Sequence, residues 1–251
     1  MPITIEVPRD VDIIEYLVGF APAFAEDEDM RAALLGVGDS LRQAALILPE
    51  PLGLFACMTA EEEAATFLYN ALVAKGYGVP RYGKLYSHVE KIKYVVLAKV
   101  LHDYFFSRVP AELAGVVVVE RDGVRPKTSR RVAIGDFFMV EENPLEAIAT
   151  IGDGETGHDK AVEAVVNEVL DDLVPNGFTL KSYIKKLSNK RNRCIYGDPL
   201  KKLRLSSEDG IEHFKSNCVS IIVLGFMISN SKGRTVSMEK LIAYISGKIF
   251  L

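Results

Sequence analysis

The chain has 251 residues, of which 49% are hydrophobic and 25% charged, and its net charge is −4. This composition is typical of a folded globular protein and excludes a disordered chain, and the length allows one large domain or two small ones. The longest apolar run, Cys218 to Ile228, is too short to span a bilayer, and no basic region precedes an apolar run near the N-terminus. We therefore expect a soluble, cytoplasmic protein with no membrane partner.

The three cysteines, Cys57, Cys194 and Cys218, are odd in number and lack C-x-x-C spacing. This pattern indicates buried thiols rather than a disulfide framework or a zinc cluster. Nothing else in the sequence indicates a metal site or a cofactor, so we expect neither.

The N-terminal half is predicted to be helical. A short strand is expected at 3–8, and a short helix at 11–24 that ends near Pro22. Apolar residues at helical spacing, interrupted by proline and glycine, predict three longer helices at about 30–48, 51–75 and 84–108.

The segment at about 115–157 has a different character and is predicted to be a β-rich insertion. A β-branched run at 116–119, with partner segments at 131–134 and 137–140, predicts a hairpin or three short strands that turn at 121–123. Its expected tip is basic and is either a polyanion contact or a charged solubility face: Arg125, Lys127, Arg130 and Arg131. The G-x-G-x-x-G match at 152–157 is rejected as a dinucleotide site, because Asp153 and Glu155 would repel a pyrophosphate and no strand follows the next helix.

Helices complete the chain at about 158–173, 178–196, 207–229 and 237–250. The predicted fold is therefore mainly α, with an N-terminal extension at 1–29 and a helical bundle at 30–251 that the β-rich segment interrupts.

Charge is divided unevenly along this chain. Residues 1–65 contain 13 acidic and 3 basic residues, whereas residues 178–204 contain 9 basic residues and only Asp198 as an acid. The basic block is suited to a polyanion such as RNA; the alternative is a solvated helix face that balances the acidic half.

Polar residues on three predicted helices point toward the apolar side. Arg191 follows Leu187 by four residues and precedes Ile195 by four, so it shares their stripe. Glu61 and Glu62 border the apolar face of their helix, and His88 shares a stripe with Ile92. Each alone is more often a structural polar group, but a buried guanidinium is costly unless it is paired. We therefore predict that these side chains meet.

Three short motifs occur in a recognisable order: Ala60-Glu61-Glu62, then His88-x-x-Lys91, then Arg191-Asn192-x-x-x-Tyr196-x-Asp198. Together they resemble the abortive-infection AbiV family within the HEPN superfamily, over about residues 30–108 and 178–230. The resemblance implies a helical bundle that is often dimeric, so we expect a homodimer.

Many HEPN proteins are metal-independent ribonucleases with an Arg-x4-6-His motif. The resemblance therefore implies that Arg191 holds the scissile phosphate and Asn192 orients it, with Tyr196 at the position of the usual His. Tyrosine titrates far above neutral pH and is a poor general base, although it can donate a hydrogen bond.

Two hypotheses remain open. In the first, the protein binds RNA or a protein partner without catalysis, and Arg191, Tyr196, Glu62 and His88 form a buried cluster. In the second, it is a metal-independent endoribonuclease toxin of antiphage defence, with the same four residues and Asn192 as its catalytic groups. In either case the expected RNA contacts are Lys185, Lys186, Lys190 and Arg193.

Overall fold

The computed structural model describes residues 4–6, 8, 11–47, 51–80, 88–104, 116–134, 137–142, 158–196, 207–234 and 236–250. Their helices are α1 (Ile13–Val18), the 3-10 helix η1 (Ala21–Phe24), α2 (Glu28–Ile47), α3 (Pro51–Ala74), α4 (His88–His102), α6 (His158–Leu173), α7 (Leu180–Tyr196), α8 (Ser207–Asn230) and α9 (Val236–Ile249). The predicted mainly α fold is confirmed, and a small four-stranded sheet accompanies the helices.

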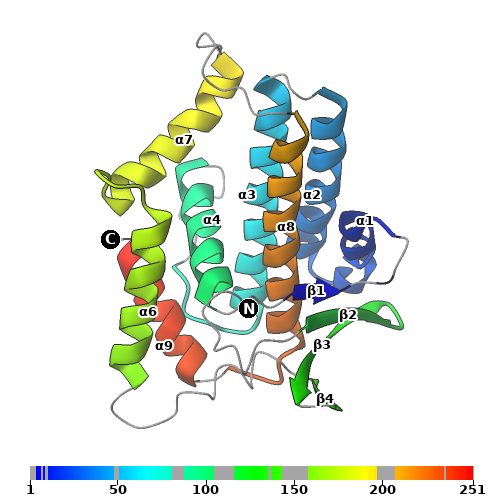
Figure 1. Cartoon of the computed structure of the whole chain (residues 1–251). Coiled ribbons are helices and arrows are strands. Elements are labelled where there is room, and N and C mark those ends of the chain that lie inside the picture. Colours follow the sequence, from blue (N-terminus) through cyan, green and yellow to red (C-terminus); the bar gives the residue numbers. More distant parts are fainter. Residues whose placement is uncertain are drawn as a thin grey trace.

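Helix α3 is the centre of the bundle and packs against α2, α4, α7 and α8 (Figure 1). Its side chains are buried on nearly every side, as expected for a helix surrounded by others. Phe67 of α3 lies edge-on to Phe226 of α8, with ring centres 5.4 Å apart, and Phe24 of η1 also packs against Phe67. Aromatic packing therefore joins α3, α8 and η1 in one apolar core.

The predicted helix at 11–24 is wrong in one respect, because it is divided into α1 and η1. Asp12 caps α1: its Oδ1 accepts hydrogen bonds from the backbone N–H groups of Ile14 (2.9 Å) and Glu15 (3.1 Å). Gly19 ends α1, and Pro22, which lacks a backbone N–H, lies in the next short turn.

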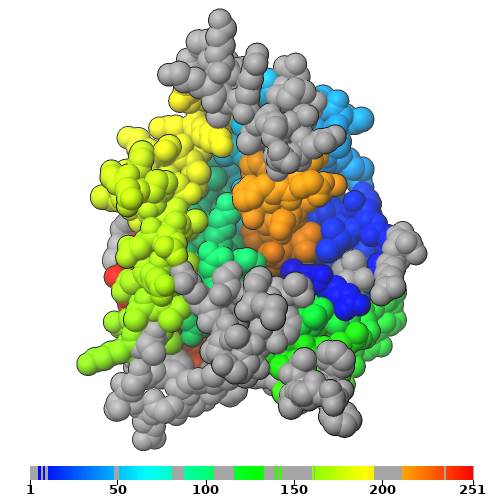
Figure 2. Space-filling view, in the orientation of Figure 1, coloured from blue at the N-terminus to red at the C-terminus, as the bar shows by residue number. Residues whose placement is uncertain are grey.

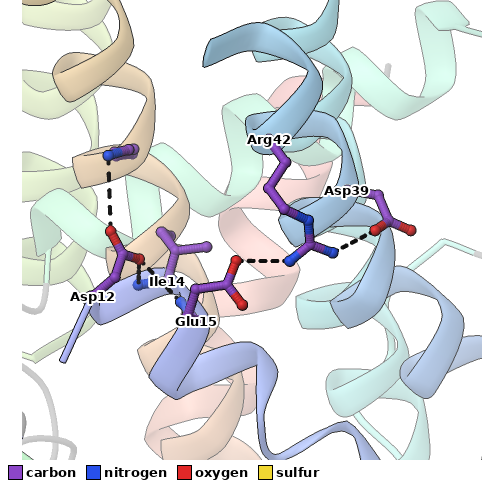
Figure 3. Close-up of polar contacts among 6 residues, drawn as sticks. Asp12, Ile14, Glu15, Asp39 and Arg42 are labelled. Carbon is purple, nitrogen blue, oxygen red and sulfur yellow. Dashed lines mark hydrogen bonds and ion pairs between the residues drawn. The ribbon is translucent and has the colours of Figure 1, made fainter. Parts of the chain in front are cut away.

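Helix α1 is also tied to α2 by charged side chains (Figure 3). Arg42 lies 2.6 Å from Glu15 and 2.5 Å from Asp39, so one guanidinium bridges the two helices. Ile14, Leu17 and Val18 of α1 are buried in the same core as the longer helices. Helices α1 and η1 are therefore part of the bundle.

The sheet has the order β1-β2-β3-β4. β1 (Thr4–Glu6) pairs in parallel with β2 (Val116–Asp122), and β2, β3 (Arg125–Ile134) and β4 (Phe137–Glu141) are antiparallel. Gly123, with φ of 61°, occupies the tight turn between β2 and β3. The three strands predicted in the insertion are confirmed, and the sequence did not indicate their pairing with β1.

The predicted basic hairpin tip requires a correction. The turn ends before Arg125, so all four basic residues belong to β3, and the side chain of Arg130 is only 1% exposed. Side chains alternate between the faces of a strand, and Thr128, Arg130 and Val132 share the buried face. Arg130 is therefore excluded as a surface contact for a polyanion.

Helix α8 contains a long apolar stretch. Residues Ile211–Asn230 are long and apolar enough to cross a membrane by length and composition, but 67% of that window is buried inside the bundle. Such burial is expected for a helix that packs against the centre of a bundle.

Three sequence predictions lie outside the described residues. They are the two ends of the predicted helix at 84–108, the G-x-G-x-x-G loop at 152–157, and the helix stop at Gly197-Asp198.

Candidate functional site

Three consecutive glutamates of α3 connect it to three other helices. Successive side chains on a helix diverge by about 100°. Glu63 binds Lys91 of α4 at 2.7 Å, Glu61 accepts a hydrogen bond from Asn217 of α8 at 2.6 Å, and Glu62 pairs with Arg191 of α7. The acidic run is therefore a polar hub inside the bundle.

Helix α7 brings Arg191 to this hub. The helix begins at a reciprocal cap, in which the Ser182 backbone N–H donates to the Thr179 hydroxyl and the Thr179 N–H donates to Ser182 Oγ. Ile184, Ser188 and Arg191 then recur at helical spacing and are all buried. Burial of this stripe turns Arg191 toward α3, as the sequence predicted.

Arg191 and Glu62 form the innermost ion pair of the site. Their side chains are only 6% and 1% exposed, and Arg191 Nε lies 2.8 Å from Glu62 Oε1. The N–H of Arg191 Nε does not point at Glu62 Oε1, so these two buried atoms form an ion pair without a hydrogen bond. The guanidinium carbon also lies 4.3 Å from the centre of the Phe55 ring, a cation–π distance. Charge attraction and ring stacking together hold Arg191.

His88 is the third member of this cluster. Its Nδ1 lies 3.5 Å from Glu62 Oε2, and its side chain is 45% exposed. The sequence placed His88 on the apolar stripe of α4, whereas the structure places it half in solvent, at the first described residue of the helix. His88 therefore lies between the buried carboxyl group and the surface.

The environment of Glu62 favours its neutral form. Burial raises the pKa of Glu62 to about 7; Arg191 and Lys91 lower it, and Glu63 and Glu61 raise it further. Burial also lowers the pKa of His88, with additional contributions from Arg191 and Lys91. A carboxyl group that titrates near neutral pH beside an imidazole can exchange a proton with it.

The sequence did not identify the partners of Glu61. Lys99 Nζ lies 3.2 Å from this carboxylate, and Asn217 also contacts His213 at 3.3 Å. The nearby charge of Glu61 adds to burial in raising the pKa of Cys57 to about 11. All three cysteines are buried and free, as predicted, so they are packed thiols.

The remaining predicted residues whose side chains are described lie outside the cluster. Asn192, next to Arg191, is exposed on the outer side of α7, and the side chain of Tyr196 lies outside the described part of the chain. Lys185, Lys186 and Arg193 are exposed as well, and Lys190 is half-buried.

A second candidate site, which we call the α7 basic face, consists of Lys185, Lys186, Lys190 and Arg193. It surrounds an open depression of about 600 Å³ lined by Ser182, Tyr183, Lys185, Lys186, Leu187, Asn189, Lys190 and Arg193. In the space-filling view α7, in yellow, lies at the surface of the molecule (Figure 2). Helix α7 therefore presents the cation of Arg191 to the core and its other five Lys and Arg side chains to the outer side.

Metal coordination has no candidate in the described part of the chain, where no group of three or more His, Cys, Asp or Glu side chains could hold an ion.

Comparisons of the chain with family models, curated proteins and solved structures found no match. The resemblance to the AbiV family therefore stays a prediction.

Replacing Arg191 tests how much the buried pair contributes. Above the Glu62 pKa, Arg191→Ala leaves a buried carboxylate without its cation, so we expect the free energy of unfolding to fall by about 3–5 kcal/mol. Glu62→Gln in the same chain should recover part of this loss, which urea denaturation of both single variants and the double variant will measure. Asn192→Ala, one residue away but exposed, should change stability by less than about 0.5 kcal/mol. Additive effects of the two site substitutions would show that the pair is not coupled.

The raised pKa of Glu62 predicts a pH effect on stability. The folded state binds this proton more tightly than the unfolded chain, so the contribution of Glu62 is greatest below its ordinary pKa of 4.5 and declines as the pH rises to about 7. A shift of this size corresponds to a loss of about 3 kcal/mol. The free energy of unfolding of the wild type should fall across this interval relative to that of Glu62→Gln. Parallel pH profiles for the two proteins would contradict the prediction.

Proposed function

We propose that this chain is an AbiV-like member of the HEPN superfamily and binds single-stranded RNA through the α7 basic face. The observation that carries the proposal is the convergence of Lys185, Lys186, Lys190 and Arg193 on one open depression. The meeting of Glu62, His88 and Arg191 supports the family assignment, because each comes from one of the three motifs on which the resemblance rests. The biological setting that this family implies is abortive infection, in which a cell limits phage growth.

The charge of α7 favours a polyanion. Residues 180–196 contain six Lys and Arg side chains and no Asp or Glu. Phosphate groups attract such a surface, and release of their counterions supplies much of the binding free energy. A helix face that only contacts water would not need to exclude Asp and Glu, as α7 does.

Aromatic side chains favour a single strand over a duplex. Tyr183 lines the depression, and Phe178, just before α7, is 40% exposed with Lys186 Nζ 4.3 Å from its ring centre. Unpaired bases stack on such rings, whereas paired bases in a duplex cannot reach them.

In this proposal the buried cluster supports the RNA surface without touching RNA. Arg191 is 5% exposed, and its charge is directed at Glu62. It fixes the rotation of α7 about its own axis and thereby keeps the basic residues on the outer side.

The salt dependence of RNA affinity tests this surface. Each cation removed should lower the slope of log affinity against log salt by about 0.7 for a single strand. The triple variant Lys185→Ala, Lys186→Ala, Lys190→Ala should therefore lose about two units of slope and bind unstructured RNA more weakly, as measured by fluorescence anisotropy. Arg31→Ala on the exposed side of α2 is the matched control and should retain wild-type binding. Unchanged affinity of the triple variant would overturn the proposal.

The Glu62–His88 pair favours a second candidate function, a metal-independent ribonuclease. The 2′-hydroxyl of RNA would attack the adjacent phosphorus and lose its proton to His88. The bond from phosphorus to the 5′-oxygen would break, and this oxygen would take a proton from solvent water, giving a 2′,3′-cyclic phosphate and a free 5′-hydroxyl. Glu62, with its pKa near 7, would accept the proton that His88 carries. Arg191 would have to separate from Glu62 to reach the phosphate.

This candidate is tested by incubating the protein with labelled RNA in the presence of a chelator. Cleavage to 2′,3′-cyclic phosphate ends is expected, and His88→Ala should reduce its rate by about 100-fold or more. His213→Ala replaces an exposed histidine of α8 and should have no effect. Absence of cleavage, or equal cleavage by His88→Ala, would reject the nuclease and leave the RNA-binding proposal intact.

A further inference from the structure

A separate cavity of about 440 Å³ lies where β1, α1, the end of α4 and α8 meet. The ribbons of β1, α1 and α8 come together at this place, and α8 lies exposed between α4 and α1 (Figures 1 and 2). The polar residues that line the cavity are Asp12, His102, Glu212, Lys215, Ser216 and Ser220. None of them belongs to the Arg191 cluster or to the α7 basic face.

The cavity presents both signs of charge at short range. Lys215 Nζ lies 3.2 Å from Glu212 Oε1 and 3.9 Å from Asp12 Oδ2. Charge-assisted hydrogen bonds measure about 2.7–2.9 Å, so the contact between Lys215 and Asp12 is a loose one. A ligand group with its own charge can therefore compete for either partner.

Asp12 is held in place before any ligand arrives. Its Oδ1 caps α1, which directs Oδ2 toward Lys215, and α1 is fixed to α2 through Glu15, Arg42 and Asp39 (Figure 3). A carboxylate oriented in this way loses little conformational entropy on binding, so its contacts contribute more to affinity.

The other walls supply an oriented ring and an apolar surface. His102 Nδ1 lies 2.9 Å from Asp103 Oδ1, and this contact sets the plane of the imidazole. Ile5, Ile13 and Val219 provide the apolar part of the lining. Small-molecule sites combine apolar surface with charged or polar groups that fix the orientation of the ligand. In this cavity the polar groups predominate, which favours a small and highly polar ligand.

We propose that this cavity binds a small zwitterionic ligand, an aliphatic α-amino acid. Its ammonium group pairs with Asp12 Oδ2 and Glu212, its carboxylate pairs with Lys215, and its side chain lies against Ile5, Ile13 and Val219. Two carboxylates and one lysine leave the lining with an excess of negative charge, which excludes a purely anionic ligand. The proposal is independent of RNA binding.

Calorimetric titration of the full chain with L-leucine tests the site. We expect a Kd of about 1 mM or tighter. Two analogues that each lack one charge are the controls: 4-methylpentanoic acid, without the ammonium group, and 3-methylbutylamine, without the carboxylate. Each loses at least one charge-assisted contact and should bind about tenfold or more weakly. Absence of leucine binding, or equal binding of 3-methylbutylamine, would overturn the proposal.

Two variants test whether leucine binds in this cavity. Asp12→Asn removes the charge but keeps an oxygen that can cap α1, so it should weaken leucine binding about tenfold while the melting temperature is retained. Lys215→Met should weaken leucine binding similarly but should not weaken binding of 3-methylbutylamine, because Lys215 no longer competes with the amine for Asp12 and Glu212. Asp29→Asn, which replaces an exposed carboxylate of α2 outside the cavity, is the matched control and should bind leucine normally. Wild-type affinity in both cavity variants would also overturn the proposal.

Discussion

The burial of Glu62 inside the bundle is the constraint on which the arrangement of the other helices depends. Removing a carboxylate from water is unfavourable unless a cation or a proton accompanies it. Arg191 supplies the cation from α7, and the raised pKa shows that burial outweighs this attraction. The position of α7 and the protonation of Glu62 are therefore linked. If α7 moves Arg191 away, the pKa of Glu62 rises further, and if Glu62 is protonated, the attraction that holds Arg191 is lost.

This polar hub complements an apolar core. Phe67 and Phe226 contribute close aromatic packing, which is strong but tolerates small rotations of a helix. Ion pairs from three adjacent glutamates tolerate fewer arrangements, because each must meet a partner on a particular helix. The three glutamates therefore restrict which faces of α4, α7 and α8 can pack against α3.

Helices α7 and α8 each present different side chains to the core and to the surface. α7 directs Arg191 inward and its lysines outward, and α8 directs Asn217 toward Glu61 while Lys215 faces the cavity beside α1. The rotation of each helix about its own axis decides which side chains it presents to the core and which to the surface. A substitution in the core can thus affect a surface site without changing any residue of that site.

The sequence by itself determined most of the helices and the inward direction of Arg191, Glu61 and Glu62, because these features follow from local spacing of apolar residues and from proline and glycine positions. Only the tertiary structure decided that β1 joins β2, that Arg130 is buried, that Glu61 binds Asn217, and that α1 and α8 enclose a cavity. Each of these depends on residues far apart in the chain, and such contacts leave no periodic signal in the sequence. The half-exposed position of His88 is of the same kind: its spacing placed it on an apolar stripe, but its exposure depends on which helices cover the beginning of α4.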